Sequence, residues 1–178
     1  VVISNGIPIN DFKTLPKTNN QNPVLSFLGT SDFKWHGIDK VVNMAKLLSD
    51  HKFYIIGPSI KKYTSSIPDN ITFTGFLEYE EYLIHLAKTD IAIGTLALHR
   101  KGMNEACALK VREYLALGLP VILAYDDTDF PNDTSFIQKL PNSENNIEPN
   151  IALVKTFINS WANKRVSKDL ISHIDIQK

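Results

Sequence analysis

Two carboxylates, Glu105 and Glu113, stand eight positions apart in the most informative segment of the chain. The residues between them change from a loop to a helical pattern, and Gly118 and Pro120 end that pattern just before an apolar run. A helix that begins near Ala108 would present its free backbone N–H groups between the two carboxylates, and such groups attract anions. Because a carboxylate accepts hydrogen bonds from hydroxyls, the spacing suits a ligand with a diol, a diphosphate and a second polyol in sequence. A nucleotide sugar is a ligand of this kind.

The spacing alone also allows a simpler interpretation. Both carboxylates could be ordinary surface charges, because negative side chains are favoured near a helix N-terminus whatever the function. Lys110 has a similar ambiguity, since its ammonium could pair with a diphosphate or extend into solvent. Arg100 and Lys101 precede Glu105 in a loop, and we expect Arg100 to be solvated.

Short apolar runs alternate with longer segments of helical period along most of the chain. This alternation is typical of a parallel sheet with helices on its faces. The expected strands are residues 24–28, 53–56, 71–74, 91–93 and 121–124. The expected helices between them are residues 38–48, 80–87 and 109–117. We therefore predict an α/β fold with a Rossmann-like parallel sheet flanked by helices.

Glycine follows four of the expected strands, at Gly29, Gly57, Gly75 and Gly94. Glycine allows the backbone to turn sharply at the end of a strand. Because ligands bind outside the carboxyl ends of the strands in such sheets, these glycines mark the expected binding edge.

The chain after the last expected strand changes in character. Residues 125–150 are rich in Asp, Asn, Pro and Ser, which predicts a long surface loop with one helical turn at residues 136–140. Residues 151–161 are amphipathic, and residues 166–174 are weakly so.

The beginning of the chain does not follow the alternating pattern. Residues 1–22 contain prolines and an Asn-rich cluster, which indicates an extended connector leading into the first strand. We accordingly divide the chain into a connector, residues 1–22, and one folded domain, residues 23–178. The chain starts at Val1 rather than Met, so we interpret it as a piece of a longer protein. The sequence has no pattern of a signal peptide and no long apolar span, so we expect neither in this piece.

Composition narrows the class of protein further. The chain has 178 residues, of which 43% are hydrophobic and 21% charged, as in a single globular domain. Nineteen Lys and Arg balance nineteen Asp and Glu, so no overall field attracts nucleic acid, and any polyanion must be held locally. A single cysteine, Cys107, excludes an internal disulfide and indicates a reducing compartment such as the cytoplasm.

Several other Asp, Cys and His residues could in principle bind a metal or act in catalysis, but their spacing gives less support for such a role. Asp126, Asp127 and Asp129 could be imagined as a cation site, but they lie among turn residues without the Gly and Glu of a calcium loop. We expect them to act in turns and caps. Cys107 has no evident His partner and is interpreted as a small packing residue. The five histidines lack metal-ligand spacing.

The segment from Glu105 to Glu113 resembles the E-x7-E motif of retaining glycosyltransferases with the GT-B fold, in particular the family-four group (glycosyl transferases group 1). Further segments resemble successive parts of the donor domain of these enzymes in the correct order: residues 2–7, 27–29, 35–40, 54–57, 71–75 and 89–93. The resemblance spans residues 1–124. It implies that residues 1–22 connect two domains and that the chain is the C-terminal, donor-binding half of a GT-B fold.

The resemblance implies a role for each matching residue. Glu113 matches the glutamate that binds the ribose hydroxyls, and Glu105 matches the catalytic-site glutamate that contacts the donor sugar. Phe76 and Leu77 match the segment whose backbone faces the nucleobase. Backbone N–H groups at the helix start meet the diphosphate, at positions that correspond to Ala108, Leu109 and Lys110. Gly29 matches the glycine that lets the phosphates approach the first loop.

The sequence departs from the family pattern around the phosphates. Members commonly carry an Arg where this chain has Thr30, and a Lys where it has His36. Either Lys34 or His36 would have to replace these cations, because the charge of a leaving diphosphate must be met when no metal does so. Lys34 could equally be a solvated loop lysine. Residues 106–108 replace the usual glycine–aromatic–glycine beside the donor sugar.

The resemblance implies a hexosyltransferase that uses a UDP- or GDP-sugar, retains the anomeric configuration and needs no metal or other cofactor. The acceptor, a glycan or lipid in polysaccharide or lipopolysaccharide synthesis, would bind a preceding N-terminal domain, and the full-length protein could associate with the membrane surface. We therefore expect this chain alone to bind nucleotide weakly and to transfer no sugar. Two alternatives stay open: a non-catalytic nucleotide-binding α/β module, and a nucleotide-sugar epimerase of the same fold.

Overall fold

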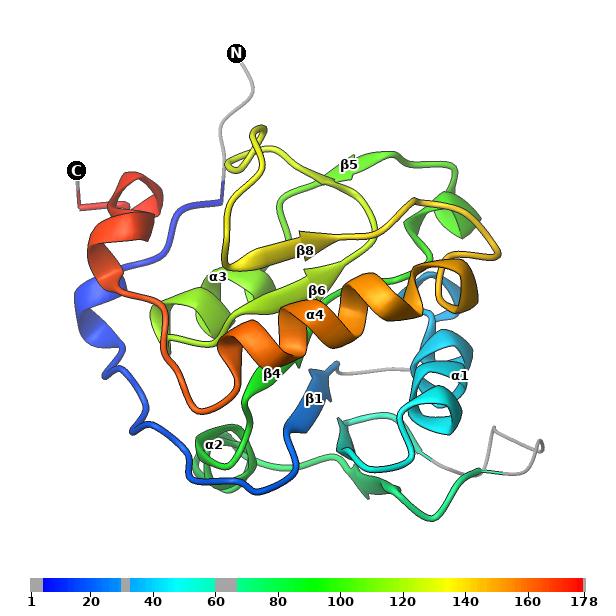
Figure 1. Cartoon of the computed structure of the whole chain (residues 1–178). Helices are drawn as coiled ribbons and strands as arrows, with labels where there is room; N and C mark the ends of the chain where they lie inside the picture. Colours follow the sequence, from blue (N-terminus) through cyan, green and yellow to red (C-terminus); the bar gives the residue numbers. More distant parts are fainter. Residues whose placement is uncertain (1–4, 30–32, 60–66, 178) are drawn as a thin grey trace.

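The computed structural model describes residues 5–29, 33–59 and 67–177. Its centre is a six-stranded sheet in the order β3-β2-β1-β4-β6-β8, and every neighbouring pair is parallel (Figure 1). The strands are β1 Val24–Leu28, β2 Lys52–Ile56, β3 Ile71–Gly75, β4 Ile91–Ile93, β6 Val121–Leu123 and β8 Ile137–Lys139. The α/β fold predicted from the alternating pattern is therefore confirmed.

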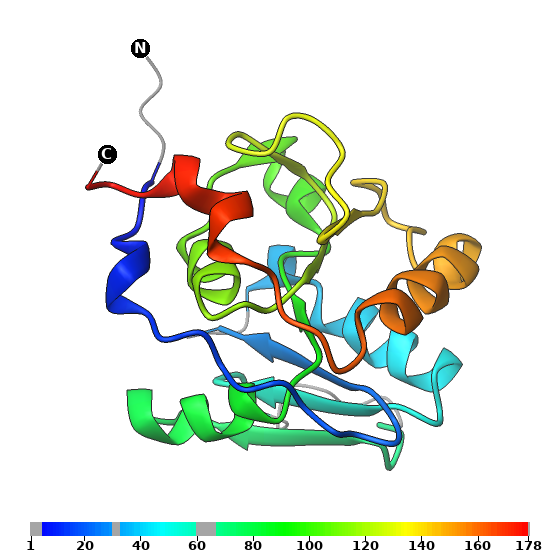
Figure 2. The same cartoon turned by 60° about the vertical axis from the view of Figure 1, so that its left-hand side comes forward.

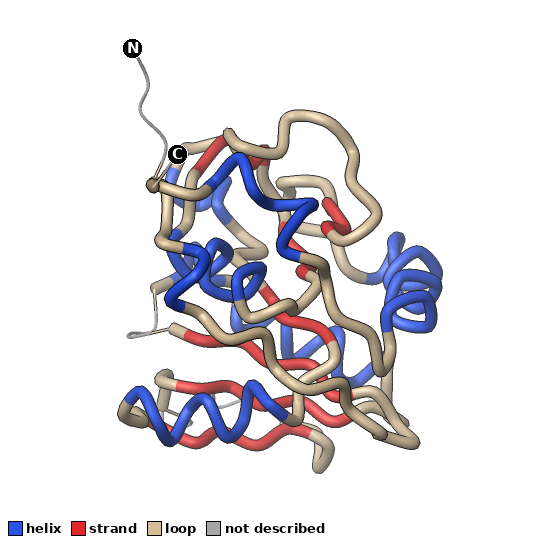
Figure 3. The backbone as a smooth tube through the Cα atoms, turned by 90° about the vertical axis from the view of Figure 1, so that its left-hand side faces the viewer, coloured by secondary structure: helices blue, strands red, loops and turns tan. Residues whose placement is uncertain are grey.

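Helices cover both faces of the sheet, as Figure 3 shows in an edge view. The α-helices are α1 Ile38–Leu47, α2 Tyr79–Ala87, α3 Leu109–Ala116 and α4 Ile151–Trp161. Short 3₁₀ helices are η1 Ile9–Asp11, η2 Lys34–His36, η4 Leu98–Lys101, η5 Glu148–Asn150 and η6 Lys168–Ile174. One core cluster joins α1 and α4 to the sheet, and a second joins α2, α3 and η6 to its other face.

The central strands explain why the sequence pattern predicts this architecture. All three residues of β4 are buried; Ile91 and Ile93 belong to the core under α1 and α4, and Ala92 belongs to the opposite core. Ile122 of β6 likewise faces one core while its neighbours Val121 and Leu123 face the other. Strands buried on both faces appear in sequence as continuous apolar runs, which is what the prediction used.

One predicted element is wrong. Residues 136–140 do not form a helical turn; they contain β8, which pairs with β6 in the register Val121↔Ile137 and Leu123↔Lys139. The backbone of β6 would otherwise expose an unpaired edge, and the pairing satisfies it. A run of three residues is too short to carry a periodic signal of its own.

Two short strands that sequence reasoning did not predict form a separate parallel pair. Strand β5 is Glu105–Ala106 and β7 is Asp126–Asp127. Glu105 lies opposite Asp126, and Ala106 lies opposite Asp127. Glu105, the residue expected to contact a donor sugar, therefore lies in a short strand, whereas the sequence predicted a loop at this position.

The described part of the first segment packs against the end of the chain (Figure 2). The Ile7 N–H donates to the Ile174 carbonyl at 3.1 Å, and Ile176 N–H donates back to Ile7. Ile7 and Ile9 are buried in the second core cluster. Residues 5–22 are therefore attached to the domain along much of their length, although their sequence has the character of a connector.

Candidate functional site

The strand order reverses between β1 and β4, because β2 and β3 lie on one side of β1 and the later strands lie on the other. In sheets of this type the crevice at such a switch point is the usual ligand site. A cavity of about 440 Å³ lies on the β1 and β2 side of this point, lined by residues from the ends of β1 and β2, from η2, from the segment after β3, and from α2 and α3. Its volume is in the range of ordinary small-molecule sites. Gly29 and Gly57 of the expected binding edge line this cavity, whereas Gly75 and Gly94 do not.

Glu113 lines this cavity from the second turn of α3. The Tyr82 hydroxyl, which comes from α2, donates a hydrogen bond of 2.8 Å to Glu113 Oε1. Burial raises the pKa of the Glu113 carboxyl above its usual value, and the hydrogen bond from Tyr82 opposes that rise. Burial and the contact with Glu113 raise the pKa of Tyr82, so its hydroxyl keeps its proton.

Lys110 lines the same cavity, three positions before Glu113 and therefore on the same face of α3. Its Nζ lies 3.9 Å from the centroid of the Phe27 ring. The Nζ atom is buried and has no hydrogen-bond partner among the residues that the structure describes. Burial lowers the pKa of Lys110 to about 7. The alternative in which this side chain extends into solvent is therefore wrong.

Helix α3 begins at Leu109, with Ala108 as its N-cap, as the sequence predicts. Alanine has no side-chain oxygen, so it cannot cap the first backbone N–H groups, and no side-chain cap is present. The first N–H groups of a helix have no partner within the helix, so those of Leu109 and Lys110 stay available to an anion.

Glycines and aromatic residues also line the cavity. Gly29 lines the cavity at the end of β1, and a Cβ added there would lie 2.8 Å from the Phe27 ring, so a larger residue would disturb the wall. Phe76 and Leu77 follow β3 and also line the cavity, and the Phe76 side chain is 68% exposed. Exposed aromatic surface beside a cavity is suited to a flat ring such as a nucleobase.

Glu105 does not line this cavity. It is exposed in β5 and borders a second hollow of about 470 Å³, together with Asp126, Asp127 and Asp129. The structure therefore brings Lys110 and Glu113 together and leaves Glu105 at a neighbouring hollow.

The structure places Lys34 and His36, the two residues suggested by the sequence to bind the phosphates, in different surroundings. His36 lines the cavity, whereas Lys34 is exposed in η2 and is not among the lining residues. Thr30 lies outside the described residues. Lys110 is therefore the lysine that the described structure brings into this cavity.

Arg112, which sequence reasoning did not single out, is completely buried beside the second hollow. Its guanidinium pairs with Asp127 and, at 2.7 Å, with Asp129. It also donates to Cys107 Sγ at 3.1 Å. Asp127 and Asp129 therefore have a specific charge partner in addition to a role in turns. Nothing in the linear spacing marks this contact, because Arg112 and Asp127 are fifteen positions apart.

Arg100 is also more than a solvated loop residue. Its guanidinium donates two hydrogen bonds of 2.8 Å to the Asp39 carboxylate and pairs with Glu144 as well. These contacts join η4 to the start of α1 and to the loop after β8. The expectation that Arg100 is solvated is therefore wrong, because two carboxylates from distant segments converge on it.

No group of three or more His, Cys, Asp or Glu side chains in the described residues is arranged to hold a metal ion. No helix among them is long and apolar enough to cross a bilayer.

The parallel strand order and the helices on both faces of the sheet define a Rossmann-like domain. Residues 22–132 match the family described as Glycosyl transferases group 1. The chain belongs to this family, and the resemblance recognised in its sequence is confirmed. No curated protein matches the chain in sequence.

Solved structures share the fold at low sequence identity. Sucrose-phosphate synthase from Thermosynechococcus elongatus has a TM-score of 0.59 at 14% identity, over 97% of this chain and 49% of the other. HepE from Anabaena, solved with UDP-glucose, has a TM-score of 0.55 at 16% identity, over 92% and 50%. The C-terminal domain of the group 1 glycosyl transferase LpcC from Francisella tularensis has a TM-score of 0.57 at 17% identity, over 87% and 88%. The chain thus spans about half of the first two proteins, as expected for one half of a GT-B fold.

Proposed function

We propose that this chain is the donor-binding half of a glycosyltransferase that uses a nucleotide diphosphate sugar. The observation that carries the proposal is the pairing of opposite chemistries on one face of α3. Glu113 offers carboxylate oxygens to a diol, and Lys110 offers a buried nitrogen without a hydrogen-bond partner in the described structure. In a nucleotide diphosphate, the ribose hydroxyls can donate hydrogen bonds to Glu113 and the negatively charged diphosphate can pair with Lys110. The two groups are only a few bonds apart.

The direction of the ligand follows from these two groups. A diphosphate has no hydrogen to give to Glu113, so its charge favours Lys110 and the first N–H groups of α3. The ribose then meets Glu113, and the base lies against Phe76 and Leu77. The support for a UDP-sugar in particular is that HepE, of similar fold, was solved with UDP-glucose.

Chemistry at this site would consist mainly of holding the leaving diphosphate. Helix N–H groups and the Lys110 ammonium would stabilise the negative charge that develops as the sugar departs, without a metal ion. Glu105 would contact the donor sugar, the configuration would be retained, and a glycan or lipid acceptor would come from another domain. We propose a role in cell-surface polysaccharide or lipopolysaccharide synthesis for the whole enzyme.

Calorimetric titration of the chain with UDP and GDP tests the proposal. Glu113→Gln should lower the affinity for the preferred nucleotide by about tenfold or more, because a carboxylate is a stronger acceptor than an amide. Glu148→Gln is a matched control, since Glu148 is exposed on η5 and does not line the cavity. Equal affinity in the Glu113 and Glu148 variants would reject the ribose-binding role and favour a non-catalytic module.

A further inference from the structure

The hydroxyl of Tyr82 has one hydrogen, and the structure uses it in the 2.8 Å bond to Glu113 Oε1. Both side chains line the cavity, one from α2 and one from α3. The Tyr79 ring packs edge-on against the Tyr82 ring, with centroids 5.3 Å apart and planes at 80°. Tyr82 therefore has a fixed orientation, and its contact with Glu113 links two helices.

This bond determines what the pair can recognise. An ionised carboxylate only accepts hydrogen bonds, and a tyrosine hydroxyl that has donated its hydrogen can also only accept. The Tyr82–Glu113 pair thus presents acceptors to the cavity and no free donor. A partner must supply hydrogens to both groups, and two adjacent hydroxyls on a sugar ring do so.

We propose that Tyr82 is a positioning and specificity residue that makes this site selective for ribonucleotides over 2′-deoxyribonucleotides. It holds the Glu113 carboxylate in one orientation, and its own oxygen adds a second acceptor for the ribose diol. The inference rests on the proposed function, because it assigns the cavity to a nucleotide. A 2′-deoxy nucleotide supplies one hydroxyl to two acceptors and leaves one of them without a partner.

The hydrogen bond from Tyr82 also affects the pKa of the Glu113 carboxyl. Burial raises the pKa of this carboxyl, and the donated hydrogen bond limits the rise. The titratable side chains that share the cavity with Glu113 are Tyr82, Tyr79, Glu78, Lys110 and His36. Removing the Tyr82 hydroxyl raises the pKa of Glu113, so binding that needs the carboxylate is lost at a higher pH as the solution is acidified.

The test compares Tyr82→Phe with Tyr54→Phe, a matched loss of one hydroxyl in β2, outside the cavity. Titrations use whichever of UDP and GDP binds the wild-type chain more tightly, together with its 2′-deoxy analogue, between about pH 5 and pH 8. We expect the wild type to prefer the ribonucleotide by about tenfold. In Tyr82→Phe the preference should fall severalfold and the acid midpoint of binding should move to higher pH, whereas Tyr54→Phe should match the wild type in both.

The outcomes separate this inference from the function on which it rests. If the wild type binds both analogues equally, or if Tyr82→Phe keeps the wild-type preference and acid midpoint, Tyr82 is not a specificity residue. The wild-type comparison needs no variant, so equal binding of the two analogues would overturn the inference even if Tyr82→Phe folds poorly. If Glu113→Gln binds nucleotide as well as the wild type, the proposed function fails first. Loss of binding in Glu113→Gln with no change in Tyr82→Phe overturns the role of Tyr82 alone.

Discussion

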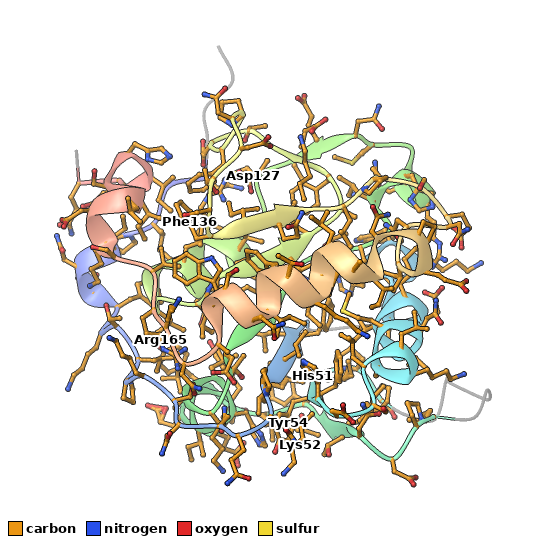
Figure 4. All side chains as sticks on the ribbon, viewed as in Figure 1. His51, Lys52, Tyr54, Asp127, Phe136 and Arg165 are labelled. Carbon is orange, nitrogen blue, oxygen red and sulfur yellow. The ribbon has the colours of Figure 1, made fainter. Side chains whose placement is uncertain are left out.

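Arg112 donates two hydrogen bonds to the carboxylate of Asp127, and both side chains are buried. Arg112 lies on α3 directly before Glu113, and Asp127 lies in β7, which pairs with the strand that contains Glu105. The contact therefore connects the helix of one motif glutamate to the strand that positions the other. The two glutamates border different hollows, and this ion pair joins α3, which lines the first hollow, to β7, which lines the second (Figure 4 labels Asp127).

Loss of this ion pair should destabilise the domain. Arg112→Met leaves the Asp127 carboxylate buried without its main partner, and we expect a loss of about 3–5 kcal/mol in the free energy of unfolding. Lys155→Met, an exposed change on α4, should have little effect. Urea unfolding followed by circular dichroism measures both.

A double variant tests the cause of that loss. Arg112→Met combined with Asp127→Leu removes both charges, so its cost should be smaller than the sum of the two single changes. Additive costs would mean that the two side chains stabilise the fold independently.

Lys110 should make nucleotide binding depend on pH above neutrality. Burial lowers its pKa to about 7, so above that pH the free site holds a neutral amine that must take up a proton to pair with a diphosphate. Each pH unit above about 7 should then lower the affinity for UDP or GDP by up to about tenfold. Calorimetry in two buffers of different ionisation enthalpy measures the proton uptake directly.

Lys110→Arg and Lys110→Met provide the contrast. Arginine stays charged, so its variant should lose the pH dependence, and methionine should bind weakly at every pH tested. A methionine variant with wild-type affinity at neutral pH would show that the ammonium does not meet the ligand.

Glu105 and Glu113 should have separable effects on ligand binding. Glu105 is outside the cavity that contains Glu113, so Glu105→Gln should change the affinity for the nucleotide alone by no more than about twofold. If Glu105 contacts the donor sugar, the same variant should reduce the additional affinity of a nucleotide sugar over its nucleotide. Parallel titrations with UDP and UDP-glucose distinguish the two. A large loss of UDP affinity would contradict this separation.

Asp90 should be essential for stability at the opposite end of the sheet. Its carboxylate is buried and accepts hydrogen bonds from the backbone N–H groups of Val24 and Asn163, both at 2.9 Å, and from the Asn20 side chain at 2.7 Å. Asp90→Ala leaves these donors unpaired, and we expect a loss of about 3 kcal/mol or more. Thermal unfolding measures the change against Asp50→Ala, an exposed control, and equal midpoints would contradict the prediction.

The amino-acid sequence predicted much of the fold because its signals are local. Apolar runs such as residues 91–93 identify buried strands, and the three- and four-residue spacing in residues 109–117 identifies a helix with its correct start. These patterns record which face of each element is buried. Residues 137–139 lack such a pattern, and they become a strand because β6 has an edge to pair.

The candidate site was predicted less completely, for a different reason. The sequence by itself determined the family, the two motif glutamates and the helix start at Leu109. Only the tertiary structure decided that the Lys110 Nζ atom is buried against Phe27, that Tyr82 donates to Glu113, and that Glu105 borders another hollow. Each of these contacts joins segments that are distant in the chain or depends on burial. The packing of α2 and α3 against the sheet fixes the geometry of these contacts. The spacing of residues along the sequence therefore does not predict them.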